Sequence, residues 1–196
     1  MIIIGFSGPA NSGKDTAAAC IARTEFRADG CDRAIVTAFA RPLKLGIIEM
    51  FDLDGDAFID RKSKERPIPE IGKSPRELAQ IIGTEIVRAI HPNAWIISMD
   101  RRLSNLQDKV LEISTLLITD VRFENEAAWV REKGGTIVHI ARPFIARWEP
   151  KGHESERGIE RNPGDYTIIN EGTLEEFERH ILSVYSSVKT NHQAQK

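Results

Sequence analysis

At 196 residues the chain is long enough to bury one full core, so we expect one domain with room for a small insertion. Its formal net charge of −2 excludes a global basic field for nucleic acid or an anionic membrane. Cys20 and Cys31 are too few for a disulfide framework, and the apolar runs are too short for a signal peptide or a membrane span, so we expect a cytoplasmic protein.

The functional prediction depends most on the stretch from Gly8 to Thr16. It follows an apolar run at residues 2–6 and precedes helix formers at 17–22, so it is expected to link a strand to a helix. The spacing Gly-x4-Gly-Lys lets loop N–H groups and the start of the helix point at one anion, and Lys14 adds charge at the outer phosphates. A glycine turn that matches by chance is the alternative, but this context favours nucleotide binding.

Asp15 departs from the usual phosphate-loop pattern. The position after the lysine commonly carries Ser or Thr, which holds magnesium, whereas here Asp15 is followed by Thr16. A carboxylate beside a triphosphate is tolerable only with a metal or a basic partner nearby.

Two cations follow the second expected strand. After a first helix over 14–27, the apolar run 34–39 is typical of a buried parallel strand. Arg41 and Lys44 come next, and the carboxyl ends of parallel strands meet at one edge, so both would stand near the phosphate loop. For either residue alone, an exposed surface cation is the alternative.

The region from 45 to 73 is expected to hold a short apolar helix at 45–51 and two polar segments. Residues 52–56 resemble a calcium loop, but Ser63 stands where a bidentate Glu is required, so a solvated loop is expected. The cationic, proline-broken connection at 61–73 is either a solvated face or a segment that closes over a phosphate.

A helix is expected to begin after Ser74, with Pro75 in its first turn and Glu77 completing a capping box. Gly83 inside this helix costs about 1 kcal/mol relative to Ala. Close approach by a ligand or a neighbouring helix would explain it, and ordinary helix packing is the alternative. The expected buried face comprises Leu78, Ile81, Ile82, Ile86, Ala89 and Ile90, and another face carries Arg76, Gln80 and Thr84.

A carboxylate ends the third expected strand. A break at 91–93 leads into a helix over 94–106, in which Trp95 reads as a core or hinge aromatic. The apolar run 116–120 then closes on Asp120, which in a phosphate-loop protein can hold magnesium directly or through water. Arg122 can neutralise phosphate oxygens from the same edge. Asp120 as a helix cap is the alternative.

The last third of the chain predicts a fourth strand, a flap, a fifth strand and a closing helix. His139 reads as an alternating residue of the strand at 136–140. The polar segment from 142 to 161 cannot bury much of itself, so a flap is expected whose arginines complete the charge shell of a transferring phosphate. A strand at 166–170 precedes a helix capped by Thr173 and Glu176, and a flexible tail is expected from Thr190. The arginines of the expected flap are Arg142, Arg147, Arg157 and Arg161.

Several motifs together resemble the phage-type deoxynucleoside monophosphate kinases over about residues 2–187. They are the loop ending Gly-Lys-Asp-Thr, Phe39-Ala-Arg-Pro-Leu-Lys44, Arg76-Glu-Leu-Ala-Gln80 with Gly83-Thr84, Asp120-Val-Arg-Phe-Glu-Asn-Glu126, and His153-x-Ser-Glu156. The resemblance implies a three-layer α/β fold of the P-loop NTPase type, with a five-stranded parallel sheet flanked by helices, a helical NMP-binding insertion and a lid. The implied kinase domain spans 1–189, with its core at 1–40, 112–141 and 165–189, the NMP-binding part at 41–107, the lid at 142–164 and a flexible tail at 190–196.

The resemblance also implies an activity and its residues. Such enzymes use Mg-ATP to convert deoxynucleoside monophosphates to diphosphates for DNA synthesis, and a homodimer is plausible. The implied catalytic residues are Lys14, Asp15, Arg122 and Arg142, and the implied magnesium ligands are Asp15, Thr16 and Asp120. ATP would contact Ser12, Gly13, Lys14, Asp15 and Thr16, and the monophosphate would contact Arg41, Lys44, Arg76, Gln80, Thr84, Trp95, Arg122 and Arg147.

The chemistry needs no general base, because a nucleotide 5′-phosphate with a second pKa of about 6 is already largely ionised. Two rivals remain: a small-molecule kinase of the phosphomevalonate or dephospho-coenzyme A type, and a nucleotide-sensing module. Adenylate kinases carry Gly where this chain has Asp15, so that parallel leaves the role of Asp15 open. The accepted bases, the side chain that excludes a ribose and the lid arginine that contacts phosphate are likewise open.

Overall fold

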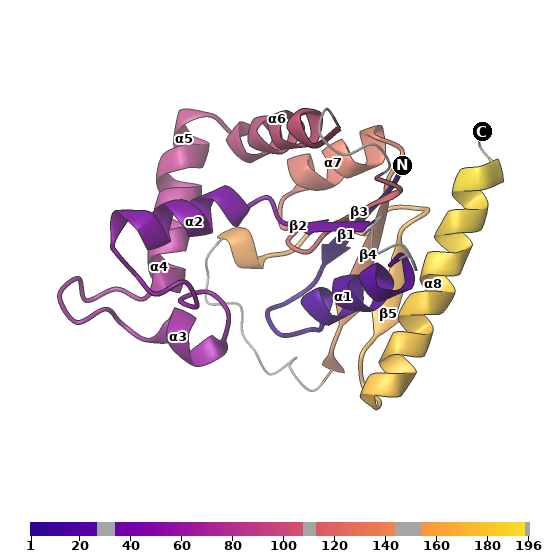
Figure 1. Ribbon diagram of the computed structural model, residues 1–196, viewed down its shortest axis with the longest axis horizontal. Coiled ribbons are helices and arrows are strands. Elements are labelled where there is room, and N and C mark those ends of the chain that lie inside the picture. Colours follow the sequence, from indigo (N-terminus) through magenta and orange to yellow (C-terminus); the bar gives the residue numbers. More distant parts are fainter. Residues whose placement is uncertain (27–33, 108–112, 144–153, 195–196) are drawn as a thin grey trace. The chain divides into compact units, whose positions relative to one another are not determined.

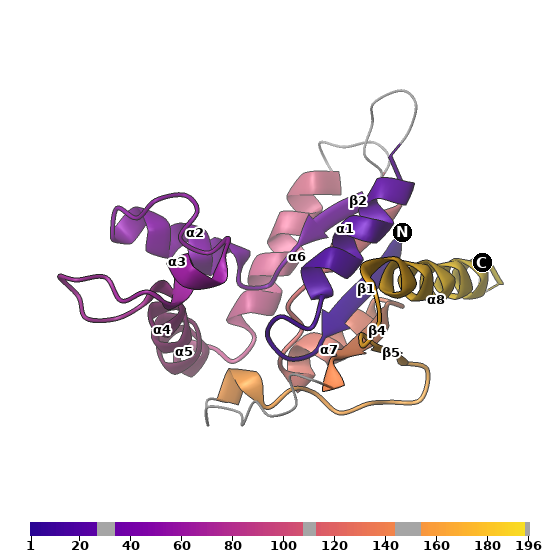
Figure 2. The same cartoon turned by 90° about the horizontal axis from the view of Figure 1, so that it is seen from below.

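The computed structural model describes residues 1–26, 34–107, 113–143 and 154–194 (Figure 1). The chain divides into two compact units: unit 1 comprises Met1–Ala38 and Arg101–Lys196, and unit 2 comprises Phe39–Asp100. Helix α6 (Ala94–Gln107) runs from unit 2 into unit 1 (Figure 2). The expected helical part at 41–107 therefore overlaps unit 2 but reaches further along the chain than the unit does.

Unit 1 is built on a five-stranded sheet in the order β2-β3-β1-β4-β5, and every pairing is parallel. Ile4 in the central strand lies opposite Leu117 on one side and Thr136 on the other. The expected five-stranded parallel sheet is confirmed, and all strands end at the same edge. The strands are β1 (Ile2–Ser7), β2 (Ala34–Thr37), β3 (Thr115–Ile118), β4 (Thr136–Ala141) and β5 (Tyr166–Ile169).

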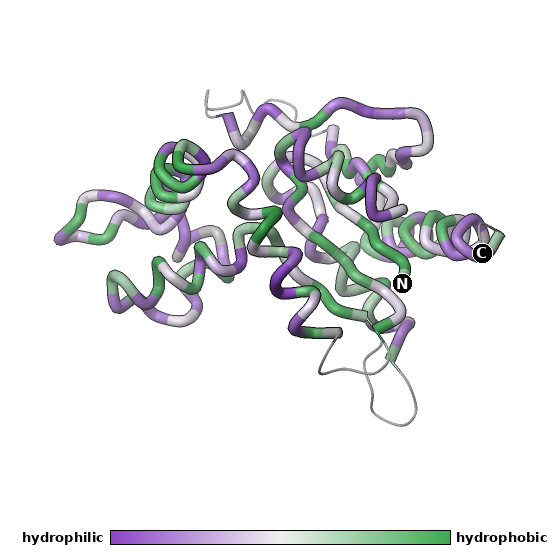
Figure 3. The backbone as a smooth tube through the Cα atoms, turned by 90° about the horizontal axis from the view of Figure 1, so that it is seen from above, coloured by the Kyte–Doolittle hydropathy of each residue, from purple (hydrophilic) through white to green (hydrophobic). Residues whose placement is uncertain are grey.

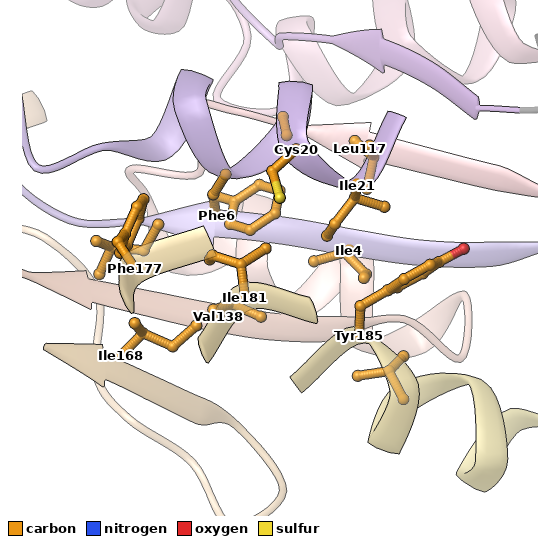
Figure 4. Close-up of a cluster of buried hydrophobic side chains, with 14 of the residues drawn as sticks. Ile4, Phe6, Cys20, Ile21, Leu117, Val138, Ile168, Phe177, Ile181 and Tyr185 are labelled. Atoms are coloured by element: carbon orange, nitrogen blue, oxygen red, sulfur yellow. The ribbon is translucent and has the colours of Figure 1, made fainter. Parts of the chain in front are cut away.

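Helices cover both faces of this sheet, which makes three layers. Ile4 and Phe6 of β1 pack against α1 (Lys14–Thr24) and α8 (Leu174–Ala194) in the main core cluster (Figure 4). Gly5 points to the other face, where a Cβ would lie 2.8 Å from Val121 Cγ2 and 3.3 Å from Val130 Cγ2 of α7 (Glu124–Glu132). The layer arrangement implied by the resemblance is confirmed.

Helix α8 continues beyond the point where a flexible tail was expected. It extends to Ala194, so that expectation is wrong for residues 190–194. Lys189 Nζ lies 2.9 Å from Glu25 Oε1, and Asn191 Nδ2 donates to Tyr166 Oη at 3.3 Å. These contacts hold the last turns of α8 against the end of α1 and the start of β5. Figure 3 shows hydrophobic and hydrophilic residues alternating around this helix. Among the described residues, none of the helices combines the length and apolar content that a membrane span needs.

Unit 2 is helical and packs around its own apolar cluster, centred on Leu43, Ile47 and Leu78. Helix α2 begins at Arg41, so the helix expected over 45–51 begins earlier than predicted, and α3 interrupts the connection expected at 61–73. Pro42 in the first turn explains the early start, because its fixed φ suits a helix N-terminus. The helices are α2 (Arg41–Met50), α3 (Arg61–Glu65), α4 (Pro75–Gln80), η1 (Ile81–Val87), α5 (Arg88–Ile90) and the first part of α6.

The helix after Ser74 starts as expected but does not stay α-helical. Ser74 and Glu77 form the predicted capping box, whereas η1 is a π-helix. A π-helix bonds each N–H five residues back instead of four, so the turn is wider and later side chains rotate out of an α-helical stripe. Ile86 is 49% exposed and Ile90 79% exposed. Their expected place on the buried face is therefore wrong.

Candidate nucleotide-binding site

The loop between β1 and α1 has the curled backbone that phosphate binding needs. Gly8, Asn11 and Gly13 have φ angles of 145°, 61° and 111°, in the region that glycine adopts without strain. Gly13 caps α1, and its carbonyl accepts from Ala17 N at 2.8 Å. The predicted sequence of strand, loop and helix is confirmed, and the N-terminus of α1 opens at the carboxyl edge of the central strand.

Lys14 folds back over this loop. Its Nζ donates to the Gly8 carbonyl at 2.8 Å and to the Pro9 carbonyl at 2.6 Å. These two bonds hold the ammonium group at the loop. Phosphate oxygens would attract it more strongly than these carbonyl oxygens, because they carry negative charge.

Neighbouring strand ends support the loop from outside. A Cβ on Gly8 would lie only 2.2 Å from the backbone oxygen of Ile140 in β4. Arg142, the first residue after β4, donates from Nη1 to the Asn11 carbonyl at 3.4 Å. Asn170, the first residue after β5, donates from Nδ2 to the Ser12 carbonyl at 2.8 Å.

Asp120 lies just beyond β3, the strand beside β1. It is 7% exposed, and the next residue, Val121, donates its N–H to the Phe6 carbonyl at 3.1 Å. This bond holds the segment after β3 against the end of β1. The structure thus places Asp120 and the phosphate loop at one edge of adjacent strands, with Asp15 and Thr16 exposed in the first turn of α1. The described residues contain no cluster of three or more His, Cys, Asp or Glu side chains suited to a metal.

Glu126 fixes the backbone around Arg122. This glutamate is only 3% exposed, and its Oε2 accepts from Arg122 N at 2.9 Å and from Phe123 N at 3.2 Å. The Arg122 side chain itself is exposed. The sequence carries a partial signal for this role, because a Glu three residues after the N-cap residue, here Phe123, can accept from the N–H of that residue as in a capping box.

Only part of the expected flap belongs to the described residues. Arg142 is exposed at the end of β4, and Arg157 and Arg161 are exposed on the return to β5. Arg147 and His153 lie outside the described residues. Near the return, η3 (Glu154–Glu156) buries Ser155.

Asp165, which belongs to no motif that the sequence shows, anchors this return. Asp165 Oδ2 lies 2.7 Å from Arg131 Nη2 of α7, 3.1 Å from His139 Nε2 of β4 and 2.9 Å from the N–H of Asn162. His139 is buried, and residues 137–140 of β4 are all buried. His139 is therefore not an alternating strand residue as expected, because both faces of the strand are covered.

Asp165 predicts an acid-dependent loss of stability. Burial opposes ionisation, but the bonds from Arg131, Asn162 and His139 outweigh it and lower the pKa of Asp165. The unfolded chain thus binds this proton more readily, so the stabilisation is complete well above about pH 4 and disappears as pH falls through the lowered pKa. We expect Asp165→Asn to lower the free energy of unfolding by about 1–3 kcal/mol at pH 7 and by less at pH 3, measured by urea titration.

Asp56→Asn is the matched control for this prediction, because Asp56 is an exposed aspartate elsewhere in the chain. An equal loss at both pH values for Asp165→Asn would contradict the account.

In unit 2, four of the residues predicted to bind the monophosphate lie on α2 and on the consecutive helices α4 and η1. Arg41 and Lys44 lie in the first turns of α2, on either side of Leu43 in sequence. A Cβ on Gly83 would lie 2.5 Å from Leu43 Cδ2, so Gly83 permits the close approach of a neighbouring helix, α2, as expected for a glycine inside this helix. Gln80 and Thr84 stand on either side of Gly83 along the chain.

Two other residues predicted to bind the monophosphate, Arg76 and Trp95, have hydrogen-bond partners inside unit 2. Arg76 Nη1 lies 3.3 Å from Glu65 Oε1. Trp95 Nε1 donates to the Gly83 carbonyl at 3.1 Å, and its ring packs on the apolar cluster of this unit. A substrate contact by Trp95 stays a prediction.

The fold and the loop define a nucleotide-binding protein of the phosphate-loop type. Residues 66–181, more than half of the chain, match the family model for deoxynucleotide monophosphate kinase. A protein of Acanthamoeba polyphaga mimivirus named for the same activity is 33% identical over 195 residues, covering 93% of this chain and 95% of that protein. The chain therefore belongs to the deoxynucleotide monophosphate kinase family, as the sequence motifs predicted.

Two further proteins are similar over different lengths. The deoxynucleoside-5′-monophosphate kinase of Escherichia phage T5 is 28% identical over 116 residues, which cover 56% of this chain and 44% of that protein. The structure of dephospho-CoA kinase from Campylobacter jejuni matches with a TM-score of 0.46 and 14% identity, covering 97% of this chain and 98% of that one. A likeness this weak bears on neither substrate nor mechanism.

Proposed function

We propose that this protein transfers the γ-phosphoryl group of Mg-ATP to a deoxynucleoside 5′-monophosphate and releases the diphosphate and ADP. The observation that carries the proposal is the phosphate loop with Lys14 folded over it, at the carboxyl edge of the central strand, in a chain of this family. The diphosphate product would supply DNA synthesis.

In the proposed reaction an oxygen of the ionised monophosphate attacks the γ-phosphorus in line with the leaving group. The bond from the γ-phosphorus to the bridging oxygen breaks, and ADP leaves with the electron pair. Backbone N–H groups of residues 12–16 hold the ATP phosphates. Lys14, Arg122 and Arg142 neutralise the charge that spreads over the transferring group.

The oxygen donors at this edge fit magnesium. Asp15, Thr16 and Asp120 offer carboxylate and hydroxyl oxygens, the ligands that a hard cation takes in proteins. Magnesium is commonly held by one or two carboxylates, with phosphates and water as the other ligands. When bound, it neutralises phosphate charge, and we propose that these three residues hold it there.

We assign the acceptor to unit 2. Arg41, Lys44 and Arg76 carry the positive charge that a monophosphate needs, and Gln80, Thr84 and Trp95 offer hydrogen bonds and a ring to the nucleoside. The contact between Leu43 and Gly83, the residues that Arg41, Lys44, Gln80 and Thr84 flank in sequence, supports this grouping. Arg76 would exchange its ion pair with Glu65 for phosphate oxygens.

The proposal is tested by ADP release from Mg-ATP with a panel of acceptors. We expect release with deoxynucleoside monophosphates and little with ribonucleotides, phosphomevalonate or dephospho-coenzyme A. A preference for either of the last two would identify the rival small-molecule kinases. ADP release at the same rate with and without each acceptor would identify the nucleotide-sensing module.

We further propose a cytoplasmic location and a homodimer. Cys20 is a free thiol buried in the core, which suits a reducing compartment. The homodimer rests on the family resemblance alone, and light scattering of the purified protein tests it.

A further inference from the structure

Asn170 links the last strand to the phosphate loop. Its backbone N–H donates to the Ala141 carbonyl at 2.7 Å, which extends the pairing of β4 and β5 by one residue. Its side chain donates from Nδ2 to the Ser12 carbonyl at 2.8 Å, although the two residues are 158 positions apart. The backbone of Asn170 is thus fixed by the sheet, and its amide holds one carbonyl of the loop.

Holding this carbonyl also sets the direction of the next N–H group. In a planar trans peptide the C=O of one residue and the N–H of the next point in opposite directions. While the Ser12 carbonyl faces Asn170, the Gly13 N–H faces away from it. A rotated peptide would present a carbonyl dipole where the loop must present donors to an anion.

The packing around Gly13 matches this contact. A Cβ on Gly13 would lie 2.8 Å from Asn170 Nδ2 and 3.0 Å from Phe177 Cζ of α8, and Gly13 has a φ of 111°. The amide of Asn170 therefore fits against the loop only because this position is glycine. Ser12 is fully buried beside it.

Lys14 and Arg142 also bond to carbonyls of this loop, and the proposed reaction needs both cations. Lys14 holds the Gly8 and Pro9 carbonyls, and Arg142 holds the Asn11 carbonyl at 3.4 Å. In the proposed function both cations turn to phosphate oxygens. The bond from Asn170 is neutral and can persist when ATP binds.

We propose that Asn170 is a positioning residue that holds the Ser12–Gly13 peptide in the orientation that binds the phosphates of ATP. It acts through the loop and touches no reacting atom. The inference rests on the proposed function, in which this loop binds ATP.

The test compares Asn170→Ala and Asn170→Asp with the native enzyme. Losing one neutral hydrogen bond predicts a rise of about three- to tenfold in the KM for ATP, with the KM for the deoxynucleoside monophosphate unchanged. Asn170→Asp keeps the shape but places a carboxylate oxygen against the Ser12 carbonyl, so a larger rise is expected. If the alanine variant does not fold, this variant of equal shape carries the test.

Thr173→Ala is the matched control. Thr173 lies in the same connection between β5 and α8, and its Oγ1 accepts from Glu176 N at 3.2 Å, so the variant loses a helix cap. Thr173→Ala should lower the melting temperature and leave the KM for ATP unchanged. An equal rise in this KM for Thr173→Ala, or no rise for either Asn170 variant, would overturn the proposal.

A binding measurement keeps this test separate from the proposed function. The rise in melting temperature caused by Mg-ATP should be smaller for both Asn170 variants than for the native protein and for Thr173→Ala. If the native protein binds Mg-ATP but transfers no phosphoryl group to deoxynucleoside monophosphates, the proposed function is refuted. The role of Asn170 in binding Mg-ATP can then still be measured from the melting shifts. Equal Mg-ATP shifts in all four proteins would refute the role of Asn170.

Discussion

Lys14→Ala is expected to abolish turnover while leaving the fold intact. In the free protein the Lys14 ammonium bonds to the carbonyls of Gly8 and Pro9. During transfer it would instead face the outer phosphates, where charge develops. Removing one such preorganised donor lowers kcat by about 100- to 1,000-fold in enzymes of known mechanism, and we expect at least this loss. Steady-state kinetics with Mg-ATP and a deoxynucleoside monophosphate measures it.

The fold should survive this change, because Lys14 is partly exposed at a loop. We expect an unchanged circular dichroism spectrum and a loss of about 1 kcal/mol in the free energy of unfolding. Lys133→Ala is the matched control, since Lys133 is an exposed cation over the Trp129 ring in α7, and its activity should equal that of the native enzyme. Normal turnover by a folded Lys14→Ala protein would refute the assignment of the loop.

Among alanine substitutions of the loop glycines, Gly8→Ala is expected to cause the largest loss of stability and of Mg-ATP binding. Gly8 has a φ of 145°, and the new Cβ would lie 2.2 Å from the Ile140 carbonyl oxygen, a backbone atom of a central strand. The loop must move, because β4 is held by pairing on both sides. We expect a loss of about 2–4 kcal/mol in the free energy of unfolding from strain and overpacking, together with loss of Mg-ATP binding. Urea titration and a melting shift with Mg-ATP measure the two effects.

Gly134→Ala separates strain from steric overlap. Gly134 also has a positive φ, of 72°, but a Cβ there meets nothing within 4 Å. We expect this variant to cost about 1 kcal/mol and to bind Mg-ATP normally. If Gly8→Ala were no more costly than Gly134→Ala, the close support of the loop by β4 would be wrong.

Features set by neighbouring residues were predictable from the sequence. The phosphate loop follows from glycine and lysine spacing between an apolar run and a helix. The caps at Ser74 and Thr173 follow from a Glu three residues later, and both are present. Each depends on contacts within a few residues, so the sequence carries the whole signal.

Features set by distant contacts were missed. The prediction that Ile86 and Ile90 lie on the buried face rested on the α-helical period of 3.6 residues per turn. No local sequence pattern predicts the π-helix, which turns both residues outward. Asp165 meets Arg131 and His139 only because the fold brings a loop back along α7 and β4. No spacing of residues along the chain predicts contacts between positions so far apart.

The candidate site shows the same division. The place of Asp120 near the end of a strand could be predicted, because a polar residue directly after an apolar run is a local signal, and Asn170 is also a polar residue directly after a strand. Its partner Ser12 could not be named, since only the strand order brings the end of β5 to the loop. Arg41 and Lys44 were expected directly after the second strand, and they follow β2 in sequence, in the first turns of α2. Their expected place near the phosphate loop stays a prediction.

Transfer of a labelled γ-phosphoryl group tests the central claim most directly. The protein is incubated with γ-labelled Mg-ATP, with and without a deoxynucleoside monophosphate, and the products are separated. We predict that the label appears in the deoxynucleoside diphosphate, only when the monophosphate is present and not with Lys14→Ala. Label that collects as inorganic phosphate, at a rate independent of the monophosphate, would show hydrolysis in place of transfer and would contradict the account.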